Sequence, residues 1–183
     1  RQCSNLVVVT IGRGIGMGMI VNGQLYHGAQ GGAGELGHTI IDASRRPAGS
    51  LEQLASDPAV LDAFSAAGQA IDLKAVSAMA QAGDDRSRAL LAASGDYLGI
   101  ALANVVNILS PEMLIVSGEG VLAGSHRLDP MLDALKRHAF NGLLDDVQVV
   151  IEPTDDQAWA RGAASLVLSK VFESPLVEID AAD

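Results

Sequence analysis

The sequence places a carboxylate and an imidazole three residues apart in a glycine-rich stretch, Gly34-Glu35-Leu36-Gly37-His38. Glu35 could accept two hydrogen bonds from hydroxyl groups, and His38 could donate or accept one. Vicinal hydroxyls of a sugar fit that arrangement, so the pair predicts a site for a small polar ligand. A solvated glutamate beside a capping histidine would give the same pattern, and the residues alone leave that alternative open.

A second candidate site is the run Gly12-Arg13-Gly14-Ile15-Gly16-Met17-Gly18, which lies between two predicted strands. Glycines at alternate positions let a backbone approach a ligand closely and present N–H groups to anionic oxygens. The run differs from the dinucleotide-binding fingerprint, because a strand follows it and no helix N-terminus is available. The alternative is a hairpin whose glycines serve only a positive φ.

A third candidate, Ser117-Gly118-Glu119-Gly120, follows a short apolar run. The carboxyl end of a sheet strand is the usual ligand crevice of α/β folds. Glu119 is unfavourable beside a phosphate, because like charges repel. Asp155-Asp156 is expected to cap the N-terminus of a helix. Metal-ligand spacing is not found at the remaining histidines, His27, His126 and His138.

The composition indicates an aliphatic core and an acidic surface. Of 183 residues, 49% are hydrophobic and only 3% are aromatic, and 12 basic against 22 acidic residues give a formal charge of −10. An acidic surface repels phosphate backbones, so this chain is not expected to bind DNA by itself. The one cysteine, Cys3, excludes a disulfide framework. We also find no secretory signal and no uninterrupted apolar run of membrane-spanning length, and we expect a cytoplasmic location.

Alternating strands and helices must position these candidates. Strands are expected at residues 5–11, 16–21 and 24–26, briefly at 39–42, and again at 113–116 and 147–151. Asn22-Gly23 predicts a tight hairpin turn between the second and third strands. Helices are expected at 51–55, from an Asp57-Pro58 start to about 67, and at 72–82, 84–109, 128–138 and 156–172. Residues 28–37 are read as a loop, 45–50 as a turn and 176–183 as a loose tail, all within one lobe.

Three runs resemble the ROK family, named for repressors, open reading frames and sugar kinases. They are VVVTIGRGIGMGMIVNGQLYHGAQGGAGELGH (7–38), LGIALANVVNILSPEMLIVSGEG (98–120) and DDQAWARGAA (155–164). The resemblance implies an α/β protein with an actin-like ATPase, ribonuclease H-like fold, a mixed β-sheet flanked by helices. It also implies two lobes around a cleft, with residues 1–183 as the C-terminal lobe and the N-terminal lobe and any DNA-binding segment outside this chain.

The resemblance also implies roles for three residues. Glu35 corresponds to the family glutamate that contacts sugar hydroxyls. His38 corresponds to a histidine that contacts sugar and, in many members, also ligates a structural zinc. Glu52, in Gly49-Ser50-Leu51-Glu52, corresponds to a later glutamate that contacts sugar.

The chain departs from the family pattern in ways that bear on metal and nucleotide. The family zinc motif has three cysteines; Ser50 stands where the last would be, the others are absent, and the spacing from His38 is short. Zinc needs about four ligands, so no metal and no cofactor are expected. Arg13 and Glu119 replace a small hydroxyl residue and a glycine of the kinases. Degenerate phosphate loops are therefore expected at Gly12, Gly14, Gly16, Gly118 and Gly120.

We expect the effector-binding lobe of an ROK-type transcriptional regulator, which binds a sugar or amino sugar and couples it to DNA binding by a separate N-terminal segment. No catalytic residue is assigned, because the catalytic aspartate of family kinases lies in the N-terminal lobe. An ATP-dependent sugar kinase is the alternative, and a silent oligomerisation module is a third reading. A homodimer or larger homo-oligomer is expected, with residues 84–109 or nearby helices close to the interface, and no membrane partner.

Overall fold

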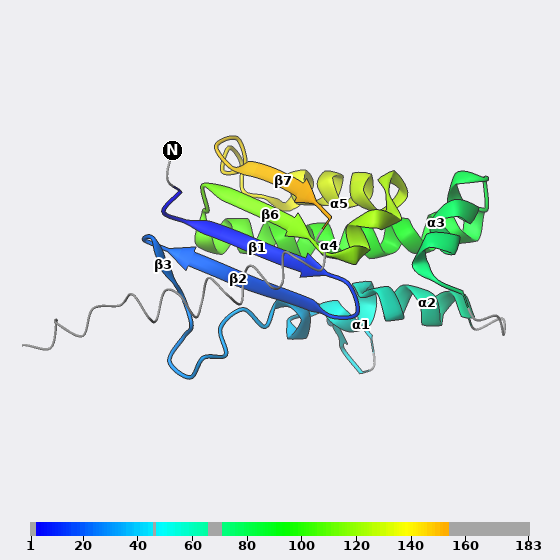
Figure 1. Cartoon of the computed structure of the whole chain (residues 1–183), viewed down its shortest axis with the longest axis horizontal. Coiled ribbons are helices and arrows are strands. Elements are labelled where there is room, and N and C mark those ends of the chain that lie inside the picture. The colour runs from blue at the N-terminus through cyan, green and yellow to red at the C-terminus, as the bar shows by residue number, and fades with distance from the viewer. Residues whose placement is uncertain (1–2, 46, 66–70, 154–183) are drawn as a thin grey trace, which may run out of the picture. The chain divides into compact units, whose positions relative to one another are not determined.

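The computed structural model describes residues 3–45, 47–65 and 71–153, and its centre is a five-stranded mixed sheet (Figure 1). Its strands are β1 (Leu6–Ile11), β2 (Ile15–Val21), β3 (Gln24–Leu25), β6 (Met113–Ser117) and β7 (Gln148–Glu152). The order is β3-β2-β1-β6-β7. β1 pairs antiparallel with β2 and parallel with β6, and β7 extends the sheet in parallel beyond β6.

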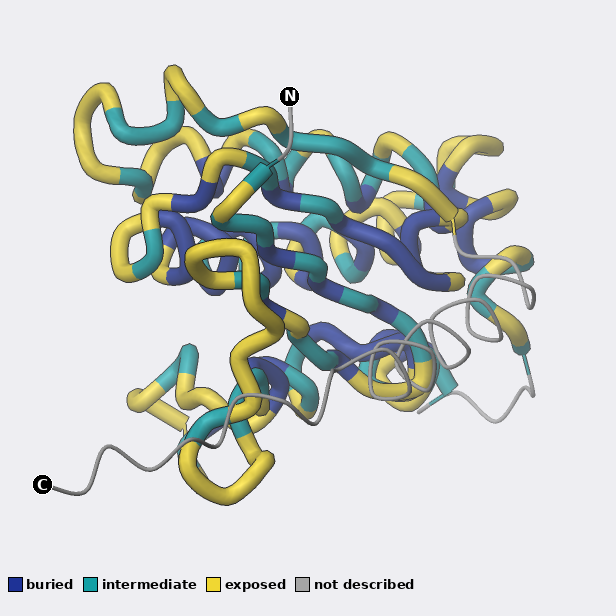
Figure 2. The backbone as a smooth tube through the Cα atoms, turned by 60° about the vertical axis from the view of Figure 1, so that its left-hand side comes forward, coloured by how far each residue is buried: buried dark blue, intermediate teal, exposed yellow. Residues whose placement is uncertain are grey.

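Two long helices, α4 (Asp85–Leu109) and α5 (Ser125–His138), cover one face of this sheet. β1 alternates between half-buried and buried residues, so that Val7, Val9 and Ile11 enter the core beside the helices. The helices lie close together because α4 carries glycine where α5 passes. A Cβ at Gly95 would lie 2.2 Å from the Arg127 carbonyl oxygen. The buried residues run along the strands and the facing sides of the helices, whereas the connecting loops are mostly exposed (Figure 2).

Shorter elements connect the hairpin strands to α4 and β6 to α5. They are the 3-10 helix η1 (Leu36–His38), β4 (Ile40–Asp42), β5 (Gly49–Ser50), α1 (Leu51–Ala55), α2 (Asp57–Ser65), α3 (Leu73–Gln81) and the 3-10 helix η2 (Glu119–Ala123). β4 and β5 pair as a separate two-stranded ribbon. A second core cluster lies among α2, α3, η2 and the start of α4, and consists of Val60, Phe64, Val76, Ala80, Leu91 and Ala123.

The expected order of elements is confirmed from the first strand to the strand at Gln148–Glu152. Four local predictions are wrong. The loop expected at 28–37 gives way to the 3-10 helix η1, which begins at Leu36. Residues 45–50 were expected to be a turn only, but Gly49–Ser50 forms a strand that pairs with Ile40–Asp42. The helix expected at 128–138 begins at Ser125. α2 begins at Asp57 itself, and the Ser56 hydroxyl accepts the Ala59 N–H at 3.3 Å in place of an aspartate cap.

Some predictions lie outside the described residues: the end of the second helix at 67, the cap at 155–156, the helix at 156–172 and the tail at 176–183. Among the described residues, α4 is long and apolar enough to cross a membrane by length and composition alone. Its burial against α5 and the sheet accounts for that apolar composition, because 56% of its most apolar stretch is buried.

Candidate functional site

Two glycines hold the Glu35–His38 block against the backbone of β2. Gly34 has a φ of +99°, and a Cβ there would lie 2.0 Å from the Met17 carbonyl oxygen. A Cβ at Gly37 would lie 2.5 Å from the Ile15 carbonyl oxygen. The Met17 N–H also donates to the Gly34 carbonyl at 3.0 Å. Because the loop lies so close to the strand, Leu36 and Gly37 are buried, whereas Glu35 and His38 are exposed.

Glu35 and His38 form an exposed pair at this surface. His38 Nε2 lies 3.7 Å from Glu35 Oε2, and the two side chains are 72% and 70% exposed, respectively. That separation is too long for a hydrogen bond, so both groups keep their capacity to bind hydroxyls. An exposed contact of this kind contributes little to stability. The pair is therefore accessible to a ligand and has no packing role.

Glu52 reaches the same region from α1. Ser50 caps the N-terminus of the helix: its hydroxyl accepts the Gln53 N–H at 3.4 Å, while Gln53 Oε1 accepts the Ser50 N–H at 3.2 Å. This capping box fixes the first turn of the helix. Glu52 Oε2 then accepts the Ile15 N–H at 2.9 Å. Its other oxygen, Oε1, has no hydrogen-bond partner within the described part of the chain.

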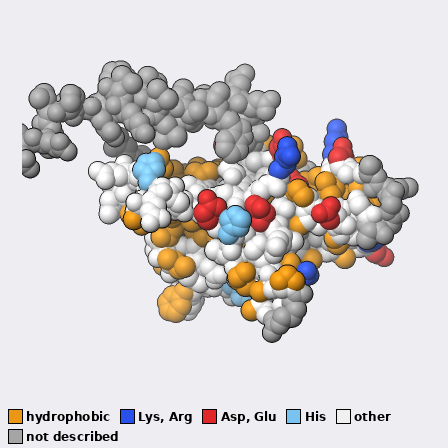
Figure 3. Space-filling model, turned by 90° about the horizontal axis from the view of Figure 1, so that it is seen from below, with side chains coloured by type: hydrophobic (Ala, Val, Ile, Leu, Met, Phe, Trp, Pro, Cys, Tyr) orange, Lys and Arg blue, Asp and Glu red, His pale blue; other side chains and the backbone are white. Residues whose placement is uncertain are grey.

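Glycines again leave the space that Glu52 occupies. A Cβ at Gly14 would lie 2.8 Å from Glu52 Oε2, and one at Gly37 would lie 3.2 Å from the same atom. The carboxylate therefore lies between the β1–β2 turn and η1, beside the residue that precedes His38. The structure brings Glu52 and the Glu35–His38 block together, and Figure 3 shows a histidine flanked by acidic side chains on this face.

Of the glycines at positions 12, 14, 16 and 18, only Gly14 is required by close packing. None of Gly12, Gly14, Gly16 and Gly18 has a positive φ, so the alternative of a turn that requires positive φ is wrong. Gly14 is required by Glu52, whereas a Cβ at Gly12 would meet nothing within 4 Å. The Gly12 carbonyl accepts the Asp57 N–H at 2.9 Å. Arg13, at the tip of the turn, is exposed.

The loop at residues 117–120 is filled by the protein itself. Gly118 has a φ of +101°, and a Cβ there would lie 2.2 Å from the Ile11 carbonyl oxygen. A Cβ at Gly120 would lie 2.6 Å from Ile11 Cγ2 and 2.9 Å from Arg127 Nη1. Both glycines are buried, and Glu119 between them is exposed. Close packing therefore accounts for these glycines without a phosphate.

A buried ion pair behind this loop was missed by sequence reasoning. Arg127 is fully buried, and its Nη1 donates to Asp57 Oδ1 at 2.7 Å and to the Gly120 carbonyl at 3.2 Å. Its Nη2 donates to the Ala55 carbonyl. Burial lowers the pKa of Arg127, and the hydrogen bond and charge of Asp57 oppose that shift. The available signal was spacing: Arg127 lies four residues before Met131, on the buried face of α5.

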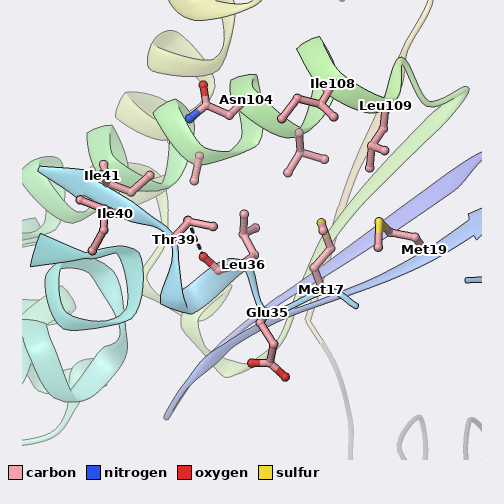
Figure 4. A pocket seen from close by; sticks show the side chains of 13 residues that line it. Met17, Met19, Glu35, Leu36, Thr39, Ile40, Ile41, Asn104, Ile108 and Leu109 are labelled. Atoms are coloured by element: carbon pink, nitrogen blue, oxygen red, sulfur yellow. Dashed lines mark hydrogen bonds between the residues drawn. The ribbon is translucent and has the colours of Figure 1, made fainter. Parts of the chain in front are cut away.

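A pocket of about 450 Å³ lies near the candidate residues but is apolar. Its walls come from β2, η1, β4 and α4, and Met17, Leu36, Ile40 and Ile108 are among the side chains that line it (Figure 4). Figure 4 shows the Glu35 carboxylate pointing away from these side chains. The exposed polar surface around Glu35, His38 and Glu52 is therefore the better candidate for a hydroxylated ligand.

The residues present do not fit a family-type zinc site. His38 is the one ligand of the family motif that the sequence retains, and the Ser50 hydroxyl is used as a helix cap. Over residues 3–45, 47–65 and 71–153, no three His, Cys, Asp or Glu side chains are grouped so as to hold a metal ion. Cys3, the one free thiol, is half-buried before β1.

The sequence model of the ROK family matches residues 1–170. The chain is 28% identical over 193 residues to a xylose repressor from Caldicellulosiruptor bescii, covering 95% of this chain and 48% of the repressor. It is 29% identical over 184 residues to a glucokinase from Halalkalibacterium halodurans, covering 89% and 56%. The chain thus spans about half the length of these relatives.

Among solved structures, the chain is similar to an ROK family transcriptional regulator described as a homolog of E. coli MLC protein. The two superpose with a TM-score of 0.76 at 29% identity, over 93% of this chain and 49% of the other. The actin-like, ribonuclease H-type fold expected from the sequence is confirmed by this likeness and by the mixed sheet flanked by helices. From the family match over residues 1–170 and this shared fold, we conclude that the chain belongs to the ROK family.

Proposed function

We propose that this chain is the C-terminal, effector-binding lobe of an ROK-type transcriptional regulator, and that a sugar or amino sugar binds at Glu35, His38 and Glu52. The observation that carries the proposal is the meeting of three segments at Glu52, where its carboxylate holds the β1–β2 turn and lies against η1. The likeness to a xylose repressor and to an ROK regulator supports the same reading.

The chemistry of the three side chains suits a polyhydroxylated ligand. Glu35 is a charged acceptor for ligand hydroxyls, and His38 beside it can donate or accept a hydrogen bond. Glu52 uses Oε2 to accept the Ile15 N–H and offers Oε1 to the ligand. Hydrogen bonds to charged acceptors are stronger than neutral ones, so the carboxylates supply most of the affinity.

We propose that ligand binding is transmitted to DNA binding through a change in the arrangement of two lobes. The ligand binds better to one arrangement than to the other, and this difference in affinity shifts the population and changes the affinity for DNA. DNA binding belongs to a separate N-terminal segment, because this chain carries a formal charge of −10. Such a regulator acts in the cytoplasm as a homodimer or larger homo-oligomer, whose two-fold symmetry suits a palindromic operator.

A sugar kinase is the second candidate, and the glucokinase relative favours it. Against it stands the loop at residues 117–120, whose glycines are buried against Ile11 and Arg127 and whose one exposed residue is the acidic Glu119. A nucleotide phosphate there would meet a negative charge instead of an open cradle of N–H groups.

The test uses the full-length protein, because the ligand would lie between two lobes. Calorimetric titration with D-xylose, D-glucose and N-acetyl-D-glucosamine should give saturable binding of at least one sugar, and that sugar should change the retention of operator DNA in a mobility-shift assay. A coupled assay with ATP and the same sugars should yield no sugar phosphate. Sugar-dependent consumption of ATP would establish kinase activity and contradict the proposed regulator function.

A further inference from the structure

We propose that Arg127 is a positioning residue for Glu52: it holds the junction of α1 and α2 against the β1–β2 turn and ties that junction to the loop at residues 117–120. Its importance for ligand binding rests on the proposed function, since Glu52 is there a ligand-binding residue. Its effect on the position of Glu52 does not depend on any ligand.

The buried side chain of Arg127 binds both helices at the α1–α2 junction. Nη2 donates to the carbonyl of Ala55, the last residue of α1, and Nη1 donates to the carboxylate of Asp57, the first residue of α2, at 2.7 Å. The guanidinium therefore spans the single residue, Ser56, that separates the two helices. The Ser94 hydroxyl adds a contact to the Ala55 carbonyl at 3.3 Å.

The other side of the junction holds the β1–β2 turn at two points. The Asp57 N–H donates to the Gly12 carbonyl at 2.9 Å, and Glu52 Oε2 accepts the Ile15 N–H at 2.9 Å. The two ends of the turn are thus held by Asp57, which pairs with Arg127, and by Glu52, which lies on the short helix α1. A shift of the α1–α2 junction would displace both of these hydrogen bonds together.

The same guanidinium fixes the loop at residues 117–120. Nη1 also donates to the Gly120 carbonyl at 3.2 Å, and a Cβ at Gly120 would lie 2.9 Å from both Nη1 and Asp57 Oδ1. Two glycine-rich segments from the ends of β1 and β6 are thereby joined to one cation. An arginine suits this task because its planar fork offers several donors in a fixed geometry, whereas a lysine offers one point charge.

Stability alone is a poor explanation of the pair. The desolvation of a buried ion pair can offset its attraction, and a well-packed apolar replacement is often neutral. The Nε of Arg127 is buried without a hydrogen-bond partner in the described part of the chain, so the desolvation is not fully compensated. The geometry points instead to placement of the α1–α2 junction.

The test measures amide hydrogen exchange by NMR at single residues of the full-length protein, with no ligand present. Ile15 is the reporter because its N–H is the donor to Glu52. In Arg127→Met we expect the Ile15 amide to exchange at least about tenfold faster than in the wild type, relative to the amides of β1. The matched control is Val76→Ala, a buried truncation in the second core cluster, chosen because it lowers stability without touching the junction. It should leave that ratio unchanged.

Two further variants keep the test decisive if Arg127→Met does not fold. Arg127→Lys keeps the charge but cannot make all three contacts, so it should also loosen Ile15. Asp57→Asn keeps the oxygen that accepts from Nη1 and should remain close to the wild type at Ile15. A uniform rise of exchange in Arg127→Met or Arg127→Lys, equal at Ile15 and in β1, would overturn the proposal.

A second measurement separates this inference from the proposed function. In the full-length protein, Arg127→Met should weaken binding of the sugar found by titration about tenfold, whereas Val76→Ala should not. If Ile15 is loosened but the sugar affinity is unchanged, the positioning role stands and Glu52 is not a ligand-binding residue. If the affinity falls without any selective change at Ile15, the positioning role is wrong.

Discussion

The carboxylate of Glu52 accepts a hydrogen bond from the backbone N–H of Ile15 at 2.9 Å, although 37 residues separate the two in sequence. The bond joins a helix N-terminus to a strand start, and Gly14 and Gly37 leave room for it. This contact joins α1 to the β1–β2 turn. It also makes Glu52 a structural residue and a candidate ligand residue at once.

Gly34 should tolerate no side chain. Gly34→Ala would place a Cβ 2.0 Å from the Met17 carbonyl oxygen at a φ of +99°, so we expect a loss of about 3 kcal/mol in the free energy of unfolding. Gly32→Ala is the control, because a Cβ there meets nothing within 4 Å. Urea unfolding of both variants measures the difference. Equal stability of the two would show that the loop is not held against β2.

The stability of the chain should fall in acid in part through Asp84. Its side chain accepts hydrogen bonds from the Ser87 hydroxyl and N–H, and these lower the pKa of Asp84. A lowered folded pKa means that the stabilisation is complete above the unfolded value, near 3.9, and is lost as the pH falls through the folded value.

Asp84→Asn isolates that contribution, because asparagine still caps a helix but does not titrate. Thermal unfolding from pH 5 down to pH 2.5 should show a smaller fall in Tm for Asp84→Asn than for the wild type. Asp42, whose pKa is also lowered by hydrogen bonds from Ser44, is present in both proteins and does not contribute to this difference. Parallel curves for the two proteins would assign the acid sensitivity to other carboxyl groups.

Zinc should be substoichiometric. With His38 as the one family-type ligand present, Ser50 used as a helix cap and no cysteine nearby, the ligand set is short of the four that zinc needs. Elemental analysis after purification without chelators should give well under one zinc per chain, and added EDTA should leave Tm unchanged. One zinc per chain, lost together with stability on chelation, would reveal a different ligand set.

Local signals were sufficient to predict the hairpin and the strands of the five-stranded sheet. Asn22 and Gly23 both have positive φ, as a two-residue hairpin turn requires, and the β-branched run at Leu6–Ile11 forms the central strand β1. The role of a glycine could not be predicted in this way. Gly118 and Gly120 suggest a phosphate loop in sequence, but their role depends on Ile11 and Arg127, which pack against them.

The pairing of Arg127 with Asp57 was equally beyond local reasoning. Spacing can place Arg127 on the buried face of α5, but its partner lies 70 positions away and looks like an ordinary charge at a helix start. Only the packing of α5 against the α1–α2 junction buries them together. The approach of Glu52 to the Glu35–His38 block could be expected from the family resemblance, yet the bond from Ile15 that places it depends on the folded turn.

Glu35 should matter for the ligand and not for the fold. Its side chain is 70% exposed and has no packing role, so Glu35→Ala should leave Tm close to the wild-type value. Loss of a charged acceptor costs on the order of 1.5–3 kcal/mol, so the affinity of the full-length protein for its sugar should fall roughly ten- to a hundredfold. Glu35→Gln is the matched control. It keeps an acceptor oxygen without the charge, so its sugar affinity should lie between those of the wild type and Glu35→Ala.

His38→Ala should have a smaller effect than Glu35→Ala if the imidazole makes one neutral hydrogen bond to the ligand, and a larger one if it also anchors the block. Calorimetric titration beside thermal melts separates binding from stability for each variant. An unchanged sugar affinity in Glu35→Ala together with a collapsed Tm would make Glu35 a structural residue. The ligand would then have to bind elsewhere, and the apolar pocket between β2 and α4 would become the next place to look.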